Sequence, residues 1–595
     1  MNSFATALKI TLLEKPVLSI LLIAMLLTLP WIGIGDFYTK GEPREATEAL
    51  SMLNDGNWIL PMDYADEIGY KPPLMHWIIA GISFLSGSVS EWSSRLPSAL
   101  GMIGMALLCL VFLKKRKNVQ TAVISALILL TSFELHRYSL ECRVDMTLAF
   151  FMSASLFGLY KWEENGLKGF PILTVLCIAC ACMVKGPIGA VLPVGTAALY
   201  YLLRGHNFWK VLWKSLLVAF PGLLILGVWY ALAYQIKGDS FLTVVFAENI
   251  GRFLGMKDQA LGIQYTLGHQ GPFWYYIPAL ILGLMPWTLI PIMILFVLLF
   301  LFIFKYKKWW KPRFSTFWNR FPLSWKRIET VDKFTLFSVL VVLLFLVFYS
   351  IPSSKRSVYI MPVYPFAAYL LTKVYFWAEQ FTPKLFKILY HSIVVVASLL
   401  LLLSAIAYFV DLSTLTAPWV HDAKTTYDIA LFAHAFRNPT LIGVFVWFLL
   451  LSVTVFFTYG IRSKNARTTI FGIFTVCIGI QVFLEGSVFP VYKNGYSLKP
   501  LAITLEKRYD LKHQGYVMNQ LMEYRNIYGL NFYLGNPFKN FDVERPASGF
   551  LVTGEKTLEK VRKNYLGKYV FKELERSNPY NELNDEIVVC QIIKL

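Results

Sequence analysis

Four groups of charged residues beside apolar segments could do chemistry in this chain. The first is Gly41-Glu42-Pro43-Arg44-Glu45, at the start of a short amphipathic segment. A helix N-terminus would keep Glu42 ionised, which makes it a candidate carboxylate for catalysis. An ordinary capping acid, with Arg44 and Glu48 as an exposed helical pair, explains the same residues. The group on its own does not separate these alternatives.

The second and third groups contain Lys71 and Asp145. In Tyr70-Lys71-Pro72-Pro73 two prolines fix the backbone, which suits a lysine that binds phosphate as a point charge. A lysine that snorkels to lipid headgroups explains the motif equally well. Asp145 ends Glu141-Cys142-Arg143-Val144-Asp145 just before an apolar run. It is either an N-cap or a carboxylate that shares general-base work with Glu42.

The fourth group is divided between two later loops. Arg252, Lys355 and Arg356 are cations on the side of the predicted spans that is otherwise poor in them. Together with Lys71 they could form a cationic pocket for a lipid-linked phosphate. His269 is a candidate metal ligand, although a lone histidine is more often a hydrogen-bonded aromatic residue.

The composition indicates what kind of scaffold must hold these residues. Of 595 residues, 56% are hydrophobic and only 16% are charged, with a mean hydropathy of +0.53. Soluble domains carry about 25% charged residues, so a disordered protein is excluded and a soluble one is disfavoured. The formal net charge of +19 would suit a polyanion partner or the cytoplasmic loops of a membrane protein.

Apolar windows long enough to cross a bilayer recur along the chain, since a spanning helix needs about 20 apolar residues. We predict a polytopic α-helical membrane protein with about thirteen spans. The windows are 14–34, 96–113, 119–133, 146–160, 170–184, 187–203, 211–234, 273–304, 334–351, 358–377, 387–410, 439–460 and 468–488.

The basic residues predict the orientation of these spans. Lys114 to Lys117, Lys305 to Lys333 with its nine Lys and Arg residues, and Arg462 to Arg467 fall on one face. The positive-inside rule makes that face cytoplasmic, with the N-terminus inside and the chain after about Pro490 outside. The net charge therefore needs no nucleic-acid partner.

The extracytoplasmic segments are predicted to carry additional structure. In the first loop, residues 35–95, helical patterns over 43–56 and 74–86 predict two interfacial helices. Strand-like runs at 550–553 and 587–593, with a helix-like run at 557–564, predict a small α/β domain over 490–595. The chain thus divides into a membrane domain, 1–489, and this second domain. The seven cysteines indicate no disulfide framework.

The order of these segments resembles the glycosyltransferase C superfamily, in particular the bacterial aminoarabinose transferase and protein O-mannosyltransferase-like group. The resemblance covers the membrane part. The motifs that carry it are Gly41-Glu42-Pro43-Arg44, Lys71-Pro72-Pro73-Leu74, Arg95-Leu96-Pro97-Ser98, Arg143-Val144-Asp145, Arg252-Phe253, His269 with 272–278, and Lys355-Arg356 with Tyr359 and Pro362.

The resemblance implies an inverting transfer of a sugar from a polyprenyl-phosphate carrier on the extracytoplasmic face of the bacterial inner membrane. The acceptor would be lipid A, a glycan or a protein. It also implies that Glu42, Arg44 and Asp145 orient or activate the acceptor. The residues implied to hold the carrier phosphate are Lys71, Arg252, Lys355, Arg356 and Tyr359.

Two departures from the pattern of the group affect this expectation. The group usually has Asp-Glu where this chain has Gly41-Glu42, and its aminoarabinose transferases place a proposed metal-ligand Glu where this chain has Tyr70. No cofactor is therefore required, and a divalent metal stays an option. The alternative function is a transporter or flippase of lipid-linked sugars, which predicts two related halves with charged residues inside the spans.

Overall fold

The computed structural model describes residues 12–62, 68–251, 270–303, 332–460, 466–517, 527–581 and 583–595. The α-helices are α2 Pro16–Thr28, α3 Gly41–Asp55, α4 Leu74–Ser86, α5 Glu91–Arg116, α6 Val119–Leu130, α7 Phe133–Ser139, α8 Val144–Glu164, α9 Ile172–Lys185, α10 Ile188–Leu203, α11 Phe208–Lys237, α12 Asp239–Phe246, α14 Tyr276–Gly283, α15 Leu289–Ile303, α18 Lys333–Ser350, α19 Tyr364–Phe381, α20 Pro383–Phe409, α21 Leu412–Thr416, α22 Ala423–Arg437, α23 Leu441–Gly460, α24 Ala466–Phe483, α25 Phe489–Gly495, α26 Lys499–Arg508, α27 Leu511–Gln514, α28 Tyr528–Tyr533, α29 Phe541–Glu544 and α30 Glu555–Asn564. Short π- or 3₁₀-helical segments are η1 Ala247–Gly251, η2 Phe273–Tyr275, η3 Ser357–Val363 and η4 Leu484–Val488.

Several of these helices are long and apolar enough to cross a membrane. Within the described residues there are six, and seven if α6 and α7, which meet at a 64° bend, form one span. Four of the six bury only a third or less of their most apolar window: α11, α18, α20 and α23 have 28%, 33%, 33% and 28% buried. So much exposed apolar surface is unfavourable in water, whereas lipid tails can cover it. The chain is therefore a multi-pass membrane protein.

The predicted number of thirteen spans is not confirmed. Several predicted windows form helices shorter than a full span, such as α2, α9 and α10. The window 273–304 is not one helix but three segments, η2, α14 and α15, with residues 284–288 between the last two. Pro286 lies in that break, where a proline lacks the N–H that a continuous helix needs.

The two helices predicted in the first loop are present. The first, α3, ends before Gly56, whose φ of 68° is a conformation that favours glycine. The second, α4, covers Leu74–Ser86 and follows Pro72-Pro73, as the sequence predicts. The two helices contact each other, and α4 also contacts α5. These contacts fix the loop against the membrane helices.

The C-terminal part of the chain contains a five-stranded mixed sheet of order β2-β1-β3-β5-β4. Its strands are β1 Gly515–Val517, β2 Lys539–Asn540, β3 Ser548–Gly554, β4 Tyr569–Arg576 and β5 Ile587–Lys594. The strand β1 is parallel to β2 and β3, whereas β5 is antiparallel to β3 and β4. The predicted small α/β fold is thus confirmed, and its boundary at residue 490 stays a prediction.

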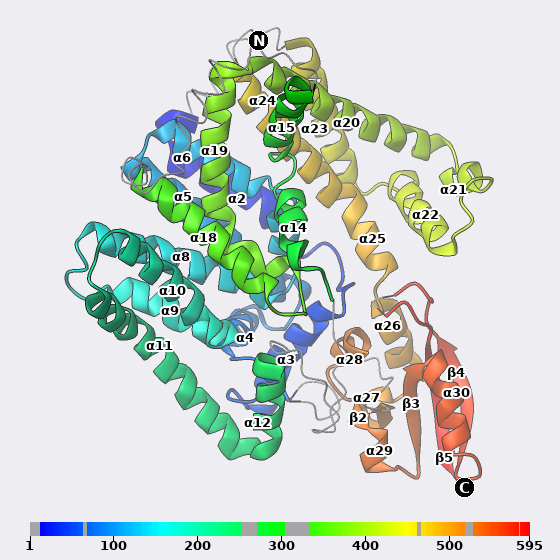
Figure 1. Cartoon of the computed structure of the whole chain (residues 1–595). Helices are drawn as coiled ribbons and strands as arrows, with labels where there is room; N and C mark the ends of the chain where they lie inside the picture. The colour runs from blue at the N-terminus through cyan, green and yellow to red at the C-terminus, as the bar shows by residue number, and fades with distance from the viewer. Residues whose placement is uncertain are drawn as a thin grey trace.

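The sheet lies beside one end of the helical body rather than within it. Figure 1 shows β3, β4, β5 and α30 at the lower right, with α3 and α28 between them and the long helices. The helix α28 contacts α3, and the Tyr533 hydroxyl donates to Glu91 at 2.9 Å. Lys499 forms ion pairs with Asp36 at 3.0 Å and Glu91 at 2.9 Å. The C-terminal part is therefore docked on the first loop.

Candidate functional site

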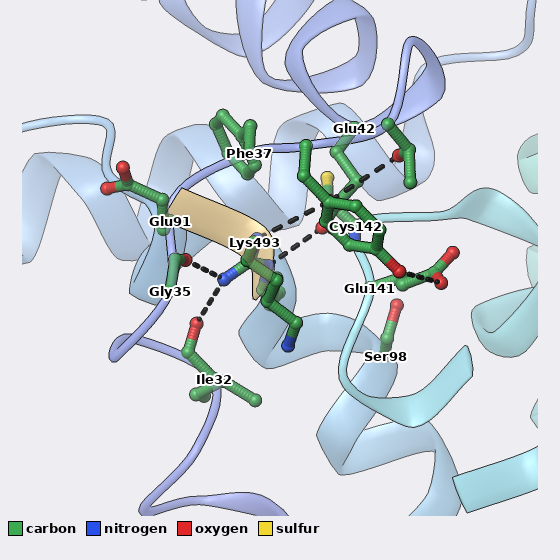
Figure 2. Close-up of polar contacts among 12 residues, drawn as sticks. Ile32, Gly35, Phe37, Glu42, Glu91, Ser98, Glu141, Cys142 and Lys493 are labelled. Atoms are coloured by element: carbon green, nitrogen blue, oxygen red, sulfur yellow. Dashed lines mark hydrogen bonds and ion pairs between the residues drawn. The ribbon is translucent and has the colours of Figure 1, made fainter. Parts of the chain in front are cut away.

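Glu42 is buried in an ion pair with Arg95, which comes from the first turns of α5. The Arg95 Nε donates to Glu42 Oε1 at 2.7 Å, and both side chains have no exposed surface. The backbone N–H of Cys142 donates to the same carboxylate oxygen at 3.1 Å. Arg95 also donates to the carbonyls of Ile32, at 3.0 Å, and Gly35 (Figure 2). This carboxylate thus joins α3, α5 and the segment that leads to Asp145.

A second buried group forms around Glu45 of α3. One carboxylate oxygen of Glu45 accepts from Lys71 and from Arg44, the latter at 3.0 Å. The other lies 2.8 Å from His76 Nε2 of α4, and the same nitrogen is 3.2 Å from Glu48 Oε2. The helix α3 places Glu45 and Glu48 on one face because they are three residues apart. The first loop therefore supplies two cations and two carboxylates within contact distance.

Burial and charge act in opposite directions on these groups. Burial alone would raise the pKa of Glu45, but the charges of Lys71 and Arg44 lower it well below its usual range. Glu48 lacks such a close cation, so burial raises its pKa. Burial and the neighbouring Arg44 charge lower the pKa of Lys71, which its pair with Glu45 only partly offsets.

A third ion-pair group involves Glu141, which the sequence analysis did not assign a role. Its carboxylate accepts from Arg143 at 2.7 Å, and from Arg137 and the Tyr38 hydroxyl at 3.2 Å. Burial would raise the pKa of Glu141, but Arg143 and Arg137 lower it overall. Both guanidinium groups also lie 5.3 Å from the Tyr138 ring. These contacts tie the segment between α7 and α8, which precedes Asp145 in the chain, to Arg137 of α7 and to Tyr38.

Asp145 in the first turn of α8 forms an ion pair with Lys185, at the end of α9. The Lys185 ammonium also lies 4.4 Å from the centre of the Tyr359 ring, in η3. Arg356 is close enough for its charge to act on Lys185, and its side chain is exposed. Lys71 is likewise close enough to interact with Asp145. Asp145, Lys71, Arg356 and Tyr359, all singled out from the sequence, therefore lie around one place.

Lys185 was not among the residues predicted from the sequence, although the criterion that selected Arg252, Lys355 and Arg356 applies to it as well. In the predicted topology the span 170–184 ends on the extracytoplasmic side, so Lys185 is one more cation against the positive-inside trend. It is followed by Gly186, whose φ of 83° allows the chain to turn directly into α10. The tight turn fixes the end of α9 and with it the lysine.

For the other predicted site residues, the structure gives no direct contact with the group around Asp145 among the residues that it describes. The Lys355 ammonium is buried and donates to the carbonyl of Pro352 in its own loop. Arg252 and His269 lie outside the described residues. The position before Lys71, where aminoarabinose transferases carry the proposed metal ligand, is Tyr70 here, and a tyrosine does not supply that carboxylate. The residues at that position therefore do not fit the metal site of the group.

Two further buried acids also escaped the sequence analysis. Glu134 of α7 accepts a hydrogen bond from the Tyr364 hydroxyl at 2.6 Å, and both residues are buried. Glu485 lies 3.5 Å from His136 and 3.8 Å from Lys493. The Lys493 stem packs on Gly35 (Figure 2), and Glu42 and Arg95 are close enough for their charges to act on Lys493. Tyr364 and His136 come from segments far from these acids in the sequence, so no local pattern could reveal these two contacts, whereas Lys493 lies only eight positions after Glu485.

Comparisons with known families and proteins show what this chain is similar to. The family model described as "Dolichyl-phosphate-mannose-protein mannosyltransferase" matches residues 70–234, which include Lys71, Asp145 and Lys185. An uncharacterized protein of Aquifex aeolicus is 27% identical over 357 residues, or 59% of this chain and 62% of that protein. An undecaprenyl phosphate-alpha-4-amino-4-deoxy-L-arabinose arabinosyl transferase of Shewanella sediminis is 26% identical over 44% of this chain and 47% of its own length. The chain thus spans less than two thirds of these relatives.

The fold comparison extends over nearly the whole chain. The crystal structure of ArnT from Cupriavidus metallidurans bound to undecaprenyl phosphate covers 97% of this chain and 98% of its own, with a TM-score of 0.62. At 16% sequence identity this likeness shows the fold. The predicted resemblance to the glycosyltransferase C superfamily and the predicted fold class are confirmed.

Proposed function

Starting from a chain with the glycosyltransferase C fold, we propose that it transfers a sugar from a polyprenyl-phosphate carrier to an acceptor of the cell envelope. The observation that carries this proposal is the group of Lys71, Lys185 and Arg356 with Tyr359 around Asp145. Cations at this position suit a lipid-linked phosphate, and the aminoarabinose transferases and ArnT support the same class of donor.

The proposed reaction is a displacement at the anomeric carbon. An acceptor oxygen attacks that carbon, and the bond from the carbon to the phosphate oxygen breaks, so the carrier leaves as polyprenyl phosphate. Charge develops on the leaving phosphate oxygen, and pre-positioned cations stabilise it most in the transition state. We assign this work to Lys71, Lys185 and Arg356, with Tyr359 beside them.

Asp145 is placed to position a cation and to orient the acceptor. Its pair with Lys185 and the nearby charge of Lys71 keep it among the cations proposed to meet the phosphate. A hydroxyl acceptor would need a base to take its proton, whereas an acceptor that is itself an ionised phosphate would need none. Lipid A, a glycan or a protein remain the acceptor classes within this proposal.

We place the reaction on the extracytoplasmic face of the bacterial inner membrane. The basic residues Lys114, Lys115 and Arg116 form the last turn of α5, and Lys117 follows it, at the opposite end from Arg95. The positive-inside rule makes the basic end cytoplasmic. Lys71, Asp145, Lys185 and the C-terminal sheet then belong to the outer side.

A variant of Lys185 tests this proposal, because the structure and not the sequence placed this lysine in the site. In cells or membranes that carry the full chain, Lys185→Met should lower sugar transfer to envelope acceptors by at least about 100-fold, because one phosphate-binding cation is lost. Lys210→Met, at an exposed position near the start of α11, is the matched control and should leave transfer unchanged. Wild-type transfer by Lys185→Met would contradict the assignment of this site.

A further inference from the structure

Three side chains of metal-ligating types converge between α3 and α4, beside Lys71 of the proposed carrier site. Glu45 and Glu48 come from α3 and His76 from α4, and their ligand atoms all lie within 4.8 Å of one another. All three side chains are buried, with 5%, 2% and 0% of their surface exposed. Among the described residues this is the one group of three or more such side chains with that spacing.

The hydrogen bonds within this group cannot satisfy every atom. The single nitrogen Nε2 of His76 faces one oxygen of Glu45 at 2.8 Å and one of Glu48 at 3.2 Å. A protonated Nε2 can donate well to one of them, and the described residues offer Glu48 Oε2 no hydrogen bond. A buried carboxylate oxygen without a donor is costly, so an additional positive group would stabilise the arrangement.

The backbone beside Glu48 leaves the space that the carboxylate needs. A Cβ atom on Gly69 would lie only 2.7 Å from Glu48 Oε2, so a larger residue there would displace it. Glycine at position 69 keeps the oxygen aimed at His76. The cluster is therefore enclosed by the loop before Lys71 as well as by the two helices.

We propose that Glu45, Glu48 and His76 bind a divalent transition-metal ion of the Zn²⁺ or Mn²⁺ type. One imidazole nitrogen and two carboxylate oxygens form a ligand set that such ions accept, whereas Mg²⁺ and Ca²⁺ prefer oxygen alone. Metal–ligand bonds of about 2.1 Å place neighbouring ligand atoms roughly 3.0–3.4 Å apart. The observed separations of 2.8 and 3.2 Å are close to that range.

The ion would also position a residue of the proposed carrier site. The two oxygens of Glu45 are divided, since one faces His76 and the other accepts from Lys71 and Arg44. An ion on the first oxygen fixes the carboxylate, and through the second oxygen it fixes the Lys71 ammonium. Metal binding itself does not depend on the transfer reaction, so the two proposals fail separately.

Metal binding to the purified full-length chain tests the proposal directly. After chelation and removal of the chelator, titration with Zn²⁺ or with Mn²⁺ should show one tight ion per chain. Glu48→Gln should weaken its binding at least tenfold, and His76→Gln should abolish it. Asp55→Asn, an exposed carboxylate at the end of the same helix, should bind as the wild type does.

Spectroscopy of the wild-type chain covers the case in which a variant fails to fold. X-ray absorption of the Zn²⁺-loaded chain should show one imidazole nitrogen among oxygen ligands. The proposal is overturned by a wild-type chain that takes up no stoichiometric ion. It is equally overturned by a bound ion without an imidazole ligand, or by binding that survives in folded His76→Gln.

Discussion

At the scale of single residues, Glu42 is the predicted catalytic group that contributes most to holding the structure together, through its buried ion pair with Arg95. Its partner Arg95 is fully buried and holds three loop carbonyls as well, those of Ile32, Gly35 and Asp36. Removal of one member of a buried pair leaves the other charge without compensation. Any loss of activity in a Glu42 variant will therefore include a loss of stability.

We accordingly expect Glu42→Ala to destabilise the protein by about 3–5 kcal/mol, because Arg95 would stay buried without its counter-charge. Thermal unfolding in detergent measures the effect. The exposed carboxylate of Asp55 on the same helix provides the control, and Asp55→Ala should change stability far less. A Glu42→Ala protein as stable as the wild type would show that Arg95 finds other partners, and would leave catalysis as the main role of Glu42.

The residue types indicated several side chains that the structure brings together, but they did not indicate the ion pairs that these side chains form. Lys71, Asp145, Arg356 and Tyr359 were chosen from the sequence, and they lie around one place. The pairs Glu42 with Arg95 and Asp145 with Lys185 join residues 53 and 40 positions apart. Such pairs depend on how the helices pack, which residue spacing along one segment does not specify.

At the scale of elements, the position of Lys185 depends on the close contact between α9 and α10. A Cβ atom on Gly189 would lie 2.4–2.6 Å from backbone atoms of Ala181 and Cys182. Backbone cannot move aside as a flexible side chain can, so the two helices would have to separate. The end of α9, with Lys185, would move with them.

Gly189→Ala should therefore lower both stability, by about 1–3 kcal/mol or more, and sugar transfer. Gly195→Ala in the same helix is the matched control, since a Cβ atom there meets nothing within 4 Å. Thermal unfolding and transfer are measured for both variants. A clash at Gly189 affects only the first variant, whereas a general effect of alanine in α10 would affect both. Equal behaviour of the two variants would contradict the role given to this contact.

Local patterns were sufficient for some elements and insufficient for others. The amphipathic period and the final glycine of α3, and the prolines before α4, predicted both interfacial helices. Hydropathy averaged over a window could not detect the breaks at 284–288 or the 64° bend between α6 and α7, because the flanking residues are equally apolar. The periodicity of apolar residues was also enough to predict β3, β5 and α30, but β1 and β2 are too short to show an alternating pattern.

At the scale of the whole molecule, the C-terminal part is attached to the loop that carries the proposed site. The backbone N–H of Phe37 donates to the Tyr533 hydroxyl at 2.9 Å, and the rings of Phe37 and Phe532 meet edge to face at 5.1 Å. Lys499 adds ion pairs to Asp36 and Glu91. These contacts can restrain the same loop segment whose carbonyls accept hydrogen bonds from Arg95.

We expect the double variant Tyr533→Phe with Lys499→Met to loosen this attachment. Hydrogen exchange measured by mass spectrometry should become faster at residues 35–40, because the Phe37 amide loses its acceptor. Arg508→Ala removes an ion pair within the C-terminal part, with Glu575, and should leave that exchange unchanged. Unaltered exchange in the double variant would contradict the proposed restraint.

The central claim is that the chain cleaves a polyprenyl-phosphate sugar and passes the sugar on. The most direct measurement supplies the purified full-length chain, in lipid nanodiscs, with undecaprenyl-phosphate-linked sugars such as aminoarabinose or mannose and with envelope lipids and proteins as acceptors. We expect acceptor-dependent release of undecaprenyl phosphate from at least one donor, lowered at least about 100-fold in Lys185→Met. Donors that all stay intact, or release that is equal in the wild type and in Lys185→Met, would contradict it.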